Sequence, residues 1–504
     1  MSGLLDRLRQ RAGDRPAVDV LLPLVCVVSA VVYALHGFAG NMPRDSAFYI
    51  YGGQLVAEGV PPYVGLFDRT GPIAQLLPGA GVLGARLVGG DDIVGVRLLF
   101  MLITVACVAV AYLLGRDLFR SRVAGLAAAA AVLSFNSFNF YATSGPREKT
   151  FMALCLLAVL LALVHQRWAT IGLLIAIGTL TWQPMFFGAF AGTVVAALLG
   201  VRTGKWRALL RVAVGGAVPT AVTVLAFLAV GHFRTFIEAF LLVNARYTSQ
   251  PDATLQKVWT SLQNGYDWSV WGLLVGLVAA LVAGVVAVWS HPRDWTPAAA
   301  TLVGSAVMLL VTTYWTMGSY NAWPDSMVFV PFGALGLGAV AALVARYLPM
   351  PAAIAVVAVW SVVATSMAAH YSITDRNHML DRHRQVVADM MHILTPDARL
   401  VSVHAPLPLV LTDQRNPSRF QIFGQGVKDY VDDIWPGGIR GYGRWVVRQE
   451  PTAIVLQAGH SPRWLMAAME GEYVRVGEAH DITWFVDLDL GDRVEQARKV
   501  VRGK

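Results

Sequence analysis

The chain has 504 residues, of which 56% are hydrophobic and 14% are charged. This composition excludes an ordinary soluble protein of this size, because it supplies too little polar surface to cover the fold in water. The formal net charge of +8 comes from Arg and Lys residues gathered at the ends of long apolar stretches. That pattern is typical of membrane topology signals and not of nucleic-acid binding.

Apolar runs long enough to cross a bilayer begin after an Arg-bearing tail. The first, about 20–38, has the position of a signal peptide, but it is long enough for an uncleaved anchor and we interpret it as the first span. Cys26, Cys107 and Cys155 lie inside apolar runs and predict neither disulfides nor a metal site. About eleven spans are predicted in all, the others near 94–115, 122–140, 150–165, 169–183, 185–200, 208–230, 269–289, 295–316, 326–345 and 350–368.

The Gly-rich segment 72–90, which Pro78 and Arg86 interrupt, is either a poor span or a helix at the interface. If it does not cross, the basic groups between the spans gather on the cytoplasmic side; if it crosses, most of them lie outside. These groups are Arg7, Arg9, Arg11, Arg15, Arg116, Arg120, Arg122, Arg167, Arg202, Lys205, Arg207, Arg293 and Arg346. We therefore predict a multi-pass plasma-membrane protein with a cytoplasmic N-terminus. The predicted extracytoplasmic segments are 39–93, 141–149, 232–268, 317–325 and everything after residue 370.

Hydropathy falls from about residue 371, and helical and strand patterns then alternate. We predict a membrane domain over 1–370 and a small soluble α/β domain over 371–504, outside the membrane. The predicted elements are helices over 378–394, 441–449 and 462–470 and strands over 400–404, 454–457 and 482–486. His404, Asp413 and the stretch NPSRFQ (416–421) show no nucleophile spacing or metal pattern. We expect this domain to bind the acceptor or to shield the cavity.

The first extracytoplasmic loop, 39–93, concentrates polar residues beside the membrane. Its segment NMPRDSAFYIYGGQLVAEGVPPYVGLFDRTGP (41–72) holds Arg44, Asp45, Glu58, Asp68 and Arg69 among aromatic residues and turn formers. Residues 46–58 have a helical pattern, so Asp45 is expected near a helix N-terminus, where the helix dipole favours a carboxylate. Asp45 is either only a helix cap or a catalytic residue, and the two roles are compatible.

The order of these features resembles the GT-C glycosyltransferases, especially the branch of the protein O-mannosyltransferases and aminoarabinose transferases. An Asp follows the first span, and a Tyr-rich helix, G-x-P-P-Y and D-R-T-G-P come after it. A second similar stretch runs from VGVRLLF (94–100) through GRDLFRSR (115–122) to YATSGPREKT (141–150). The resemblance implies a GT-C fold, catalysis by Asp45, a lipid-phosphate site near Arg69 and a catalytic acid at Glu148. The branch commonly reads Lys-Pro-Pro where this chain has Arg69-Thr70-Gly71-Pro72.

The implied reaction moves a hexose or pentose, with mannose and arabinose as candidates, from a polyprenyl-phosphate donor to a glycan, lipid or protein acceptor. The phosphate is already a leaving group, so the enzyme needs a base for the acceptor hydroxyl and cations for the phosphate. We expect inversion, with Asp45 as the base and Arg69, Arg147 or Lys149 on the phosphate. Glu148 would orient the acceptor or Arg147, or supply a second carboxylate. The further predicted substrate contacts are Arg44, Tyr49, Tyr63, Asp68, Arg246, Tyr320 and Asn321.

Several alternatives stay open. The charges of Arg147-Glu148-Lys149 suit a solvated loop, and the polar and aromatic residues of 232–268, like Trp323, suit interfacial anchors. No cofactor is expected to be required; a divalent metal is an alternative, although the first loop lacks an Asp-x-Asp pair. A flippase for lipid-linked glycans would be expected to have charges within several spans and repeated halves, a combination that the sequence does not have. A non-catalytic scaffold presenting 371–504 would leave the loop acids unexplained.

Overall fold

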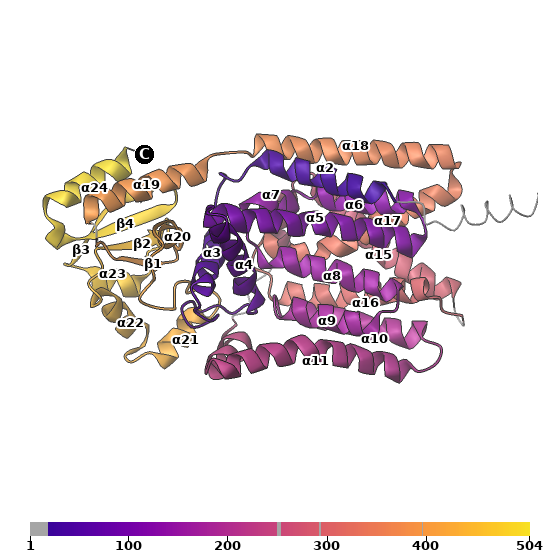
Figure 1. The fold of residues 1–504 in the computed structure, drawn as a ribbon, viewed down its shortest axis with the longest axis horizontal. Helices are drawn as coiled ribbons and strands as arrows, with labels where there is room; N and C mark the ends of the chain where they lie inside the picture. The colour runs from indigo at the N-terminus through magenta and orange to yellow at the C-terminus, as the bar shows by residue number, and fades with distance from the viewer. Residues whose placement is uncertain (1–18, 249–253, 292–293, 396, 504) are drawn as a thin grey trace, which may run out of the picture.

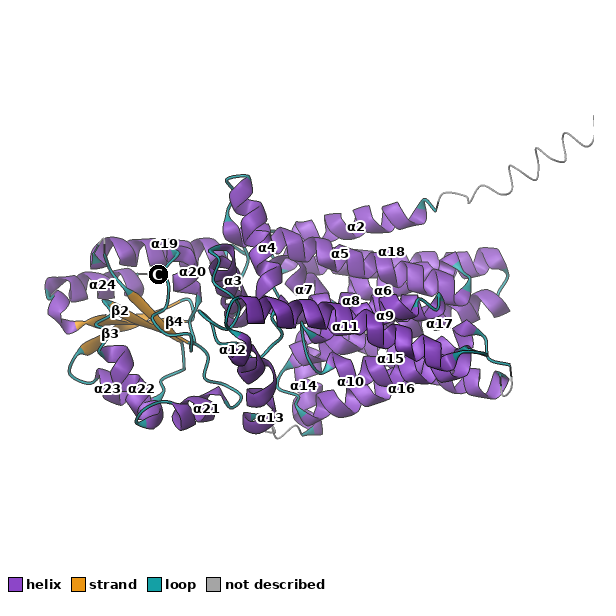
Figure 2. Ribbon diagram, turned by 60° about the horizontal axis from the view of Figure 1, so that its bottom comes forward, coloured by secondary structure: helices purple, strands orange, loops and turns teal. Residues whose placement is uncertain are grey.

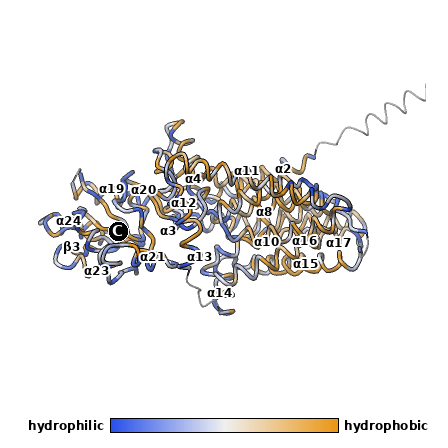
Figure 3. The backbone as a smooth tube through the Cα atoms, turned by 90° about the horizontal axis from the view of Figure 1, so that it is seen from below, coloured by the Kyte–Doolittle hydropathy of each residue, from blue (hydrophilic) through white to orange (hydrophobic). Residues whose placement is uncertain are grey.

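The computed structural model describes residues 19–248, 254–291, 294–395 and 397–503. Five of the predicted cytoplasmic groups, Arg7, Arg9, Arg11, Arg15 and Arg293, lie outside the described residues. Figure 1 shows an elongated helical bundle with a small sheet and its helices at one end. The bundle is coloured as mostly apolar and the sheet end as more polar in Figure 3, as expected of a membrane part and a water-exposed part.

The bundle contains every predicted apolar run as helix. Its helices are α2 (Leu21–His36), α5 (Asp92–Phe119), α6 (Arg122–Ser134), α7 (Asn136–Ser144), α8 (Glu148–Val164), α9 (Trp168–Thr179), α10 (Met185–Gly200), α11 (Lys205–Ala229), α15 (Ser269–Ser290), α16 (Pro297–Gly318), α17 (Val330–Tyr347) and α18 (Met350–Thr374). Among the described residues, six helices are long and apolar enough to cross a membrane, or seven if α6 and α7 form one broken span. The remaining predicted spans are the shorter helices α2, α8, α9 and α10.

The predicted span 122–140 is not one straight helix. It breaks at Phe135 into α6 and α7, which are bent by 64°. Around the break the chain is polar, and the Asn139 side chain donates to the Leu133 carbonyl at 3.1 Å while the Ser269 hydroxyl accepts from the Asn136 N–H at 3.3 Å. Side chains that bond the backbone compete with the helical ladder, and this permits the bend.

Two helices of the first loop, α3 (Arg44–Ala57) and α4 (Ile73–Leu87), lie between the bundle and the sheet (Figure 1). At the start of α4, the Ile73 N–H donates to the Leu180 carbonyl at the tip between α9 and α10. At its other end, Arg86 pairs with Asp413 of the C-terminal part at 3.3 Å. Both ends of α4 are therefore at one end of the bundle, so this segment does not traverse it, as the interfacial interpretation of 72–90 expected.

The segments predicted to be extracytoplasmic meet at this same end of the bundle. Polar contacts join them: Arg147 to Asp45, Lys149 to Asp325, and Arg69 to Thr248. The connections at the opposite end carry the basic residues predicted to be cytoplasmic. They are joined by Arg116 to Asp19, His165 to Asp117, and Arg202 to Asp294. Two groups of loops thus face away from each other across the apolar helices.

The short elements near the junction are α12 (Phe233–Ile237), the π-helix η1 (Glu238–Leu242), α13 (Val243–Tyr247), α14 (Leu255–Tyr266) and the 3-10 helix η2 (Trp323–Phe329). The C-terminal elements are α19 (Met379–Leu394), β1 (Leu400–Val403), α20 (Leu407–Thr412), α21 (Val427–Ile434), α22 (Gly438–Val447), β2 (Ala453–Gln457), α23 (Arg463–Met469), β3 (Tyr473–Ala479), β4 (Ile482–Asp487), η3 (Leu488–Leu490) and α24 (Asp492–Arg502). Within the described residues, strands occur only in this part (Figure 2).

The sheet has the order β1-β2-β4-β3, with β1 and β2 parallel and the other pairs antiparallel. Alternate residues of its central strands enter two different cores, because successive side chains point to opposite faces. Val455 and Trp484 pack in a core with α19, α24 and α3, whereas Ile454 and Phe485 pack in a core with α21, α22 and α23. Through α3, the first loop shares an apolar core with the C-terminal sheet.

Candidate active site

The site is built around Asp45 in the first turn of α3. The cap of this helix is Pro43, and its side chain makes no capping hydrogen bond. Asp45 instead accepts hydrogen bonds from two guanidinium groups, from Arg44 Nε at 3.1 Å and from Arg147 Nη1 at 2.5 Å. The interpretation of Asp45 as only a helix cap is therefore wrong, and the dipole of α3 adds to a site that side chains dominate.

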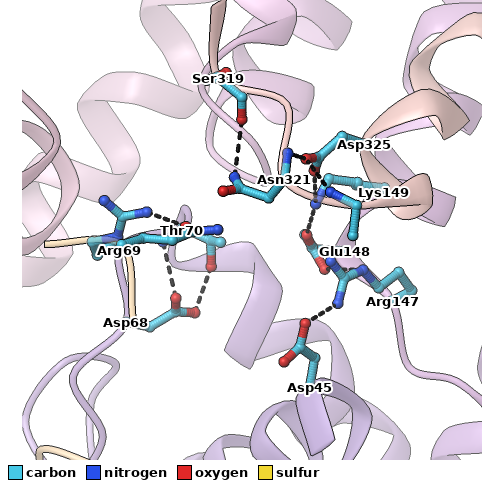
Figure 4. Close-up of polar contacts among 12 residues, drawn as sticks. Asp45, Asp68, Arg69, Thr70, Arg147, Glu148, Lys149, Ser319, Asn321 and Asp325 are labelled. Atoms are coloured by element: carbon cyan, nitrogen blue, oxygen red, sulfur yellow. Dashed lines mark hydrogen bonds and ion pairs between the residues drawn. The ribbon is translucent and has the colours of Figure 1, made fainter. Parts of the chain in front are cut away.

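Ion pairs continue from Asp45 into the bundle as an alternating chain of charges (Figure 4). Arg147 Nε lies 3.3 Å from Glu148 Oε2, and Lys149 Nζ lies 2.7 Å from Glu148 Oε1. Lys149 also lies 3.2 Å from Asp325 Oδ1 in η2. Arg147, Glu148 and Lys149 are buried, so these residues are not the solvated loop charges that one alternative expected. Buried charges of this kind persist only when they are paired.

The Asp45 carboxylate stays partly accessible, with 34% of its side chain exposed, whereas Glu148 has 1%. Burial alone would raise the pKa of Asp45, but the positive charges of Arg147 and Arg44 overcome it and hold the pKa well below its usual range. Asp45 is therefore ionised at neutral pH. Among the three carboxylates of this chain of charges, Asp45 is the most exposed, since Asp325 has 13% of its side chain exposed.

Asp325 and Trp182 position Lys149. Asp325 Oδ2 accepts from the Asn321 N–H at 2.8 Å, which closes the turn that precedes η2. The Lys149 ammonium lies 5.4 Å from the centre of the Trp182 ring, within the range of a cation–π contact. Trp182 belongs to the tip between α9 and α10. Asp325 ends the predicted extracytoplasmic segment 317–325, and its pairing with Lys149 depends on the fold.

Arg69 lies apart from this chain of charges (Figure 4). Its guanidinium donates to Thr248 Oγ1 at 3.2 Å and to the side chain of Gln425. Its carbonyl accepts from Gln183 Nε2 and from Asn244 Nδ2, both at 2.7 Å. The structure therefore does not bring Arg69 and Asp45 together. Gln183 and Asn244 had no predicted role, because nothing in the sequence around them indicates that their side chains donate to the Arg69 carbonyl.

The D-R-T-G-P turn also has its own internal order. Asp68 accepts from the Thr70 N–H at 3.0 Å and from the Thr70 hydroxyl. Burial raises the pKa of Asp68 to about 6, against the opposing effect of these hydrogen bonds. Gly71 passes so close to the tip between α9 and α10 that a Cβ there would lie 1.8 Å from the Leu180 carbonyl oxygen. Only glycine fits this approach.

The other predicted substrate contacts are spread around the junction. Tyr49 is buried, and burial, followed by the charges of the Glu148 and Asp68 carboxylates, raises its pKa. Tyr63 is fully buried and its hydroxyl donates to the Thr70 carbonyl at 2.8 Å, which is a packing position. Tyr320 is buried and donates to Ser261 at 3.0 Å. Arg246 is exposed in the last turn of α13.

A residue without a predicted role, Arg97 of α5, holds the chain that leads into Asp45. It is fully buried, and its guanidinium donates to the carbonyls of Phe38 at 2.5 Å, Gly40 at 3.2 Å and Asn41 at 2.9 Å. The available signal was an Arg inside an apolar run, since a charge in a membrane helix usually has a structural or functional reason. No group of three or more metal-ligand side chains occurs among the described residues.

We expect Arg97→Met to lower both the melting temperature and the transfer rate. It leaves three carbonyls without their donor, at a cost of about 3 kcal/mol in the free energy of unfolding, and it frees the segment before α3. Arg97→Lys should lie between the variant and the wild type, because an ammonium cannot reach all three carbonyls. Thermal unfolding in detergent and initial rates measure the two effects. Wild-type values for Arg97→Met would contradict this role.

Comparisons with known proteins agree with the fold. The profile of glycosyltransferase family 87 matches residues 78–313, somewhat less than half of the chain. No curated protein matches the sequence. ArnT from Cupriavidus metallidurans in the apo state is similar in structure, with a TM-score of 0.51, 17% identity and coverage of 92% of this chain and 97% of that chain.

Two further solved structures are similar. ArnT from Cupriavidus metallidurans bound to undecaprenyl phosphate has a TM-score of 0.51 and 14% identity, covering 93% of this chain and 98% of that chain. The Archaeoglobus fulgidus oligosaccharyltransferase in its apo form has a TM-score of 0.55 and 12% identity, and the match covers 87% of this chain and 70% of that chain. The apolar helices and the polar junction thus define a multi-pass membrane protein of GT-C fold. Over residues 78–313, the chain is also similar to glycosyltransferase family 87.

Proposed function

We propose that the protein transfers a sugar from a polyprenyl-phosphate donor to an extracytoplasmic glycan, lipid or protein, with inversion and with Asp45 as the general base. The observation that carries this proposal is the contact of a partly exposed, ionised carboxylate with a buried run of cations. Arg44 and Arg147 contact Asp45, and Lys149 follows through Glu148. A base and a phosphate site side by side are what such a transfer needs.

In the proposed step, a hydroxyl of the acceptor gives its proton to Asp45 as its oxygen attacks the anomeric carbon. The bond from that carbon to the phosphate oxygen breaks, and its electron pair leaves with the polyprenyl phosphate. Arg147 and Lys149 stand closest to the base and are favoured for the phosphate. Arg69 reaches it only after releasing Thr248 and Gln425. Attack opposite the leaving group inverts the anomeric centre.

Glu148 keeps the cations in place in this proposal. Its two carboxylate oxygens contact Arg147 and Lys149, and its side chain is 1% exposed. A second carboxylate acting as a nucleophile would have to face the substrate, and this buried, doubly paired group does not. We therefore propose that Glu148 orients Arg147 and Lys149; the sequence led us to expect this role toward Arg147 only. The sugar is proposed to be mannose or arabinose, the two candidates that the Ala-, Arg-, Gly- and Val-rich sequence suggests.

The decisive experiment supplies the purified protein with n-octyl glycosides as acceptors and with polyprenyl-phosphate mannose, arabinose or aminoarabinose as the donor. The matching polyprenyl-pyrophosphate and nucleotide sugars serve as control donors. We expect consumption of at least one monophosphate-linked sugar and of none of the controls. Chromatography of the released polyprenyl phosphate measures the turnover. Consumption of a nucleotide sugar, or of no donor at all, would overturn the proposal.

The proposal also requires the junction to face the outside of the cell. In a chain whose native cysteines are replaced by Ala, we expect a cysteine at Leu255, which is 90% exposed, to react with an impermeant maleimide on intact cells. A cysteine at Arg202, whose side chain is 78% exposed at the other end of the bundle, should react only after permeabilisation. The reverse pattern would place the site in the cytoplasm and contradict the predicted topology.

A further inference from the structure

The carboxyl ends of the two parallel strands bring three polar side chains together. In the register of β1 and β2, Val403 pairs with Leu456. The next residues along each strand, His404 and Gln457, are therefore neighbours at the same edge of the sheet, and His460 follows in the loop after β2. Ligand sites in sheets with parallel strands form at this edge, because the loops leaving the strands diverge there.

The carboxyl ends of β1 and β2, called the strand edge below, lie beside Asp45, the proposed base. Arg44 donates through Nε to Asp45 Oδ1 at 3.1 Å and through Nη1 to Gln457 Oε1 at 3.3 Å. One side chain therefore bridges the Asp45 carboxylate and the end of β2. Asp45 keeps 34% of its side chain exposed beside this bridge.

His404 offers an unused hydrogen-bond donor at this edge. The residue is buried, with a left-handed backbone φ of 62°, and its N–H donates to the Gln421 carbonyl at 2.8 Å. Its ring Nε2 accepts from the Phe423 N–H at 3.2 Å, which places the proton of the neutral ring on Nδ1. Burial, then His460 and Arg44, lowers the pKa of His404 to about 3, so the ring is neutral. Among the described residues, Nδ1 has no partner.

His460 completes the edge from the solvent side. The His460 ring is exposed, and its centre lies 4.2 Å from the centre of the His404 ring. The centre of the Phe423 ring lies 5.9 Å from the centre of the His404 ring. Planar side chains that each present one or two polar atoms match the neighbouring hydroxyl groups of a sugar. A buried donor without a partner is unfavourable, so a hydroxyl that accepts from it gains binding free energy.

We propose that His404, Gln457 and His460 form the acceptor subsite, and that it binds the terminal sugar of a glycan. This inference rests on the proposed function. In it, the exposed His460 ring moves away from His404, whose Nδ1 it helps to cover, and the His404 Nδ1–H then donates to one hydroxyl of that sugar. A second hydroxyl of the sugar reaches Asp45. That second hydroxyl gives its proton to Asp45 and attacks the anomeric carbon of the donor, whose bond to the phosphate oxygen breaks. The strand edge thus selects the acceptor while the bundle holds the donor.

The test compares two reactions of the full-length purified protein with the same donor. One is transfer to n-octyl glycosides of mannose, arabinofuranose, galactose and glucose, and the other is hydrolysis of the donor by water alone. The variants are His404→Gln, which keeps an acceptor for the Phe423 N–H but loses the Nδ1–H, and His460→Phe, which keeps the ring. His392→Gln in α19, an exposed histidine, is the control. We expect a KM for the glycoside raised roughly tenfold in each variant, with hydrolysis within twofold of the wild type.

Each result bears on the proposal. A raised KM for the glycoside with unchanged hydrolysis supports it, and an unchanged KM in both variants overturns it. Transfer and hydrolysis falling together would mean that the histidines support the donor site, which also overturns it. A wild-type protein that hydrolyses the donor but transfers to none of the glycosides would overturn the glycan subsite alone. A wild-type protein that consumes no donor contradicts the proposed function itself.

Discussion

Asp45→Asn is expected to reduce sugar transfer by at least about a hundredfold and up to about ten-thousandfold, the range of general-base catalysis. The amide has the shape of the carboxylate but cannot take the acceptor proton at neutral pH. It also removes the negative charge that Arg44 and Arg147 share, at 3.0 and 2.5 Å. Initial rates of polyprenyl phosphate release measure the loss.

Binding of the donor lipid separates this effect from a folding defect. Because the phosphate is held by cations in the proposal, Asp45→Asn should bind polyprenyl phosphate at least as tightly as the wild type. The matched control is Asp267→Asn, an exposed Asp with a left-handed φ of 47° that Asn also adopts, and it should be neutral. Wild-type turnover in Asp45→Asn would remove Asp45 from the role of base.

Arg147→Met is expected to damage both stability and activity. The Arg147 side chain is 8% exposed and contacts both Asp45 and Glu148. Its removal leaves the buried Glu148 with Lys149 alone, and breaking a buried pair from one side costs about 3 kcal/mol or more in the free energy of unfolding. Transfer should fall at least about a hundredfold, because a charge-assisted contact to the phosphate is lost. Melting temperature, donor binding and initial rates measure the three effects.

Arg147→Lys separates charge from geometry. It restores a positive charge beside Glu148 but not the planar fork that contacts two carboxylates, so it should recover the melting temperature more fully than the transfer rate. Arg246→Met, at an exposed position on the same side of the bundle, is the control and should change neither. If the Arg147→Met variant has the melting temperature and the transfer rate of the wild type, the chain of ion pairs has no part in stability or catalysis.

The membrane architecture was readable from the sequence because it depends on local composition. Each predicted apolar run is helical, and the juxtamembrane helix expected over 46–58 is α3. The strands predicted near 400, 454 and 482 are present as β1, β2 and β4. The edge strand β3 and the helices α20, α21 and α24 were not predicted. The sequence did not predict β3 because the burial of its residues is irregular. Only a strand with one buried and one exposed face shows a strict alternation of apolar and polar residues.

Contacts between distant segments were not readable in this way. The sequence placed Asp45, Arg69 and Glu148 on one side of the membrane, and all three do lie at one end of the bundle. It could not show that Asp45 contacts Arg147, a neighbour 102 positions away, while Arg69 turns toward Thr248 and Gln425. Nor could it show that a strand edge more than 350 residues away would lie beside the base.

The sequence by itself therefore determined that this is a membrane protein and where its apolar helices lie. It also determined the helix that carries Asp45 and the class of enzyme that its loops resemble. These features follow from hydropathy, charge placement and short motifs, which act over a few neighbouring residues. Only the tertiary structure decided which cations pair with Asp45, that Arg97 holds the chain before it, and that Arg44 links Asp45 to Gln457 at the end of β2. Those choices depend on how the helices and the sheet pack, because ion pairs and buried hydrogen bonds form between whichever groups the packing brings within about 3 Å.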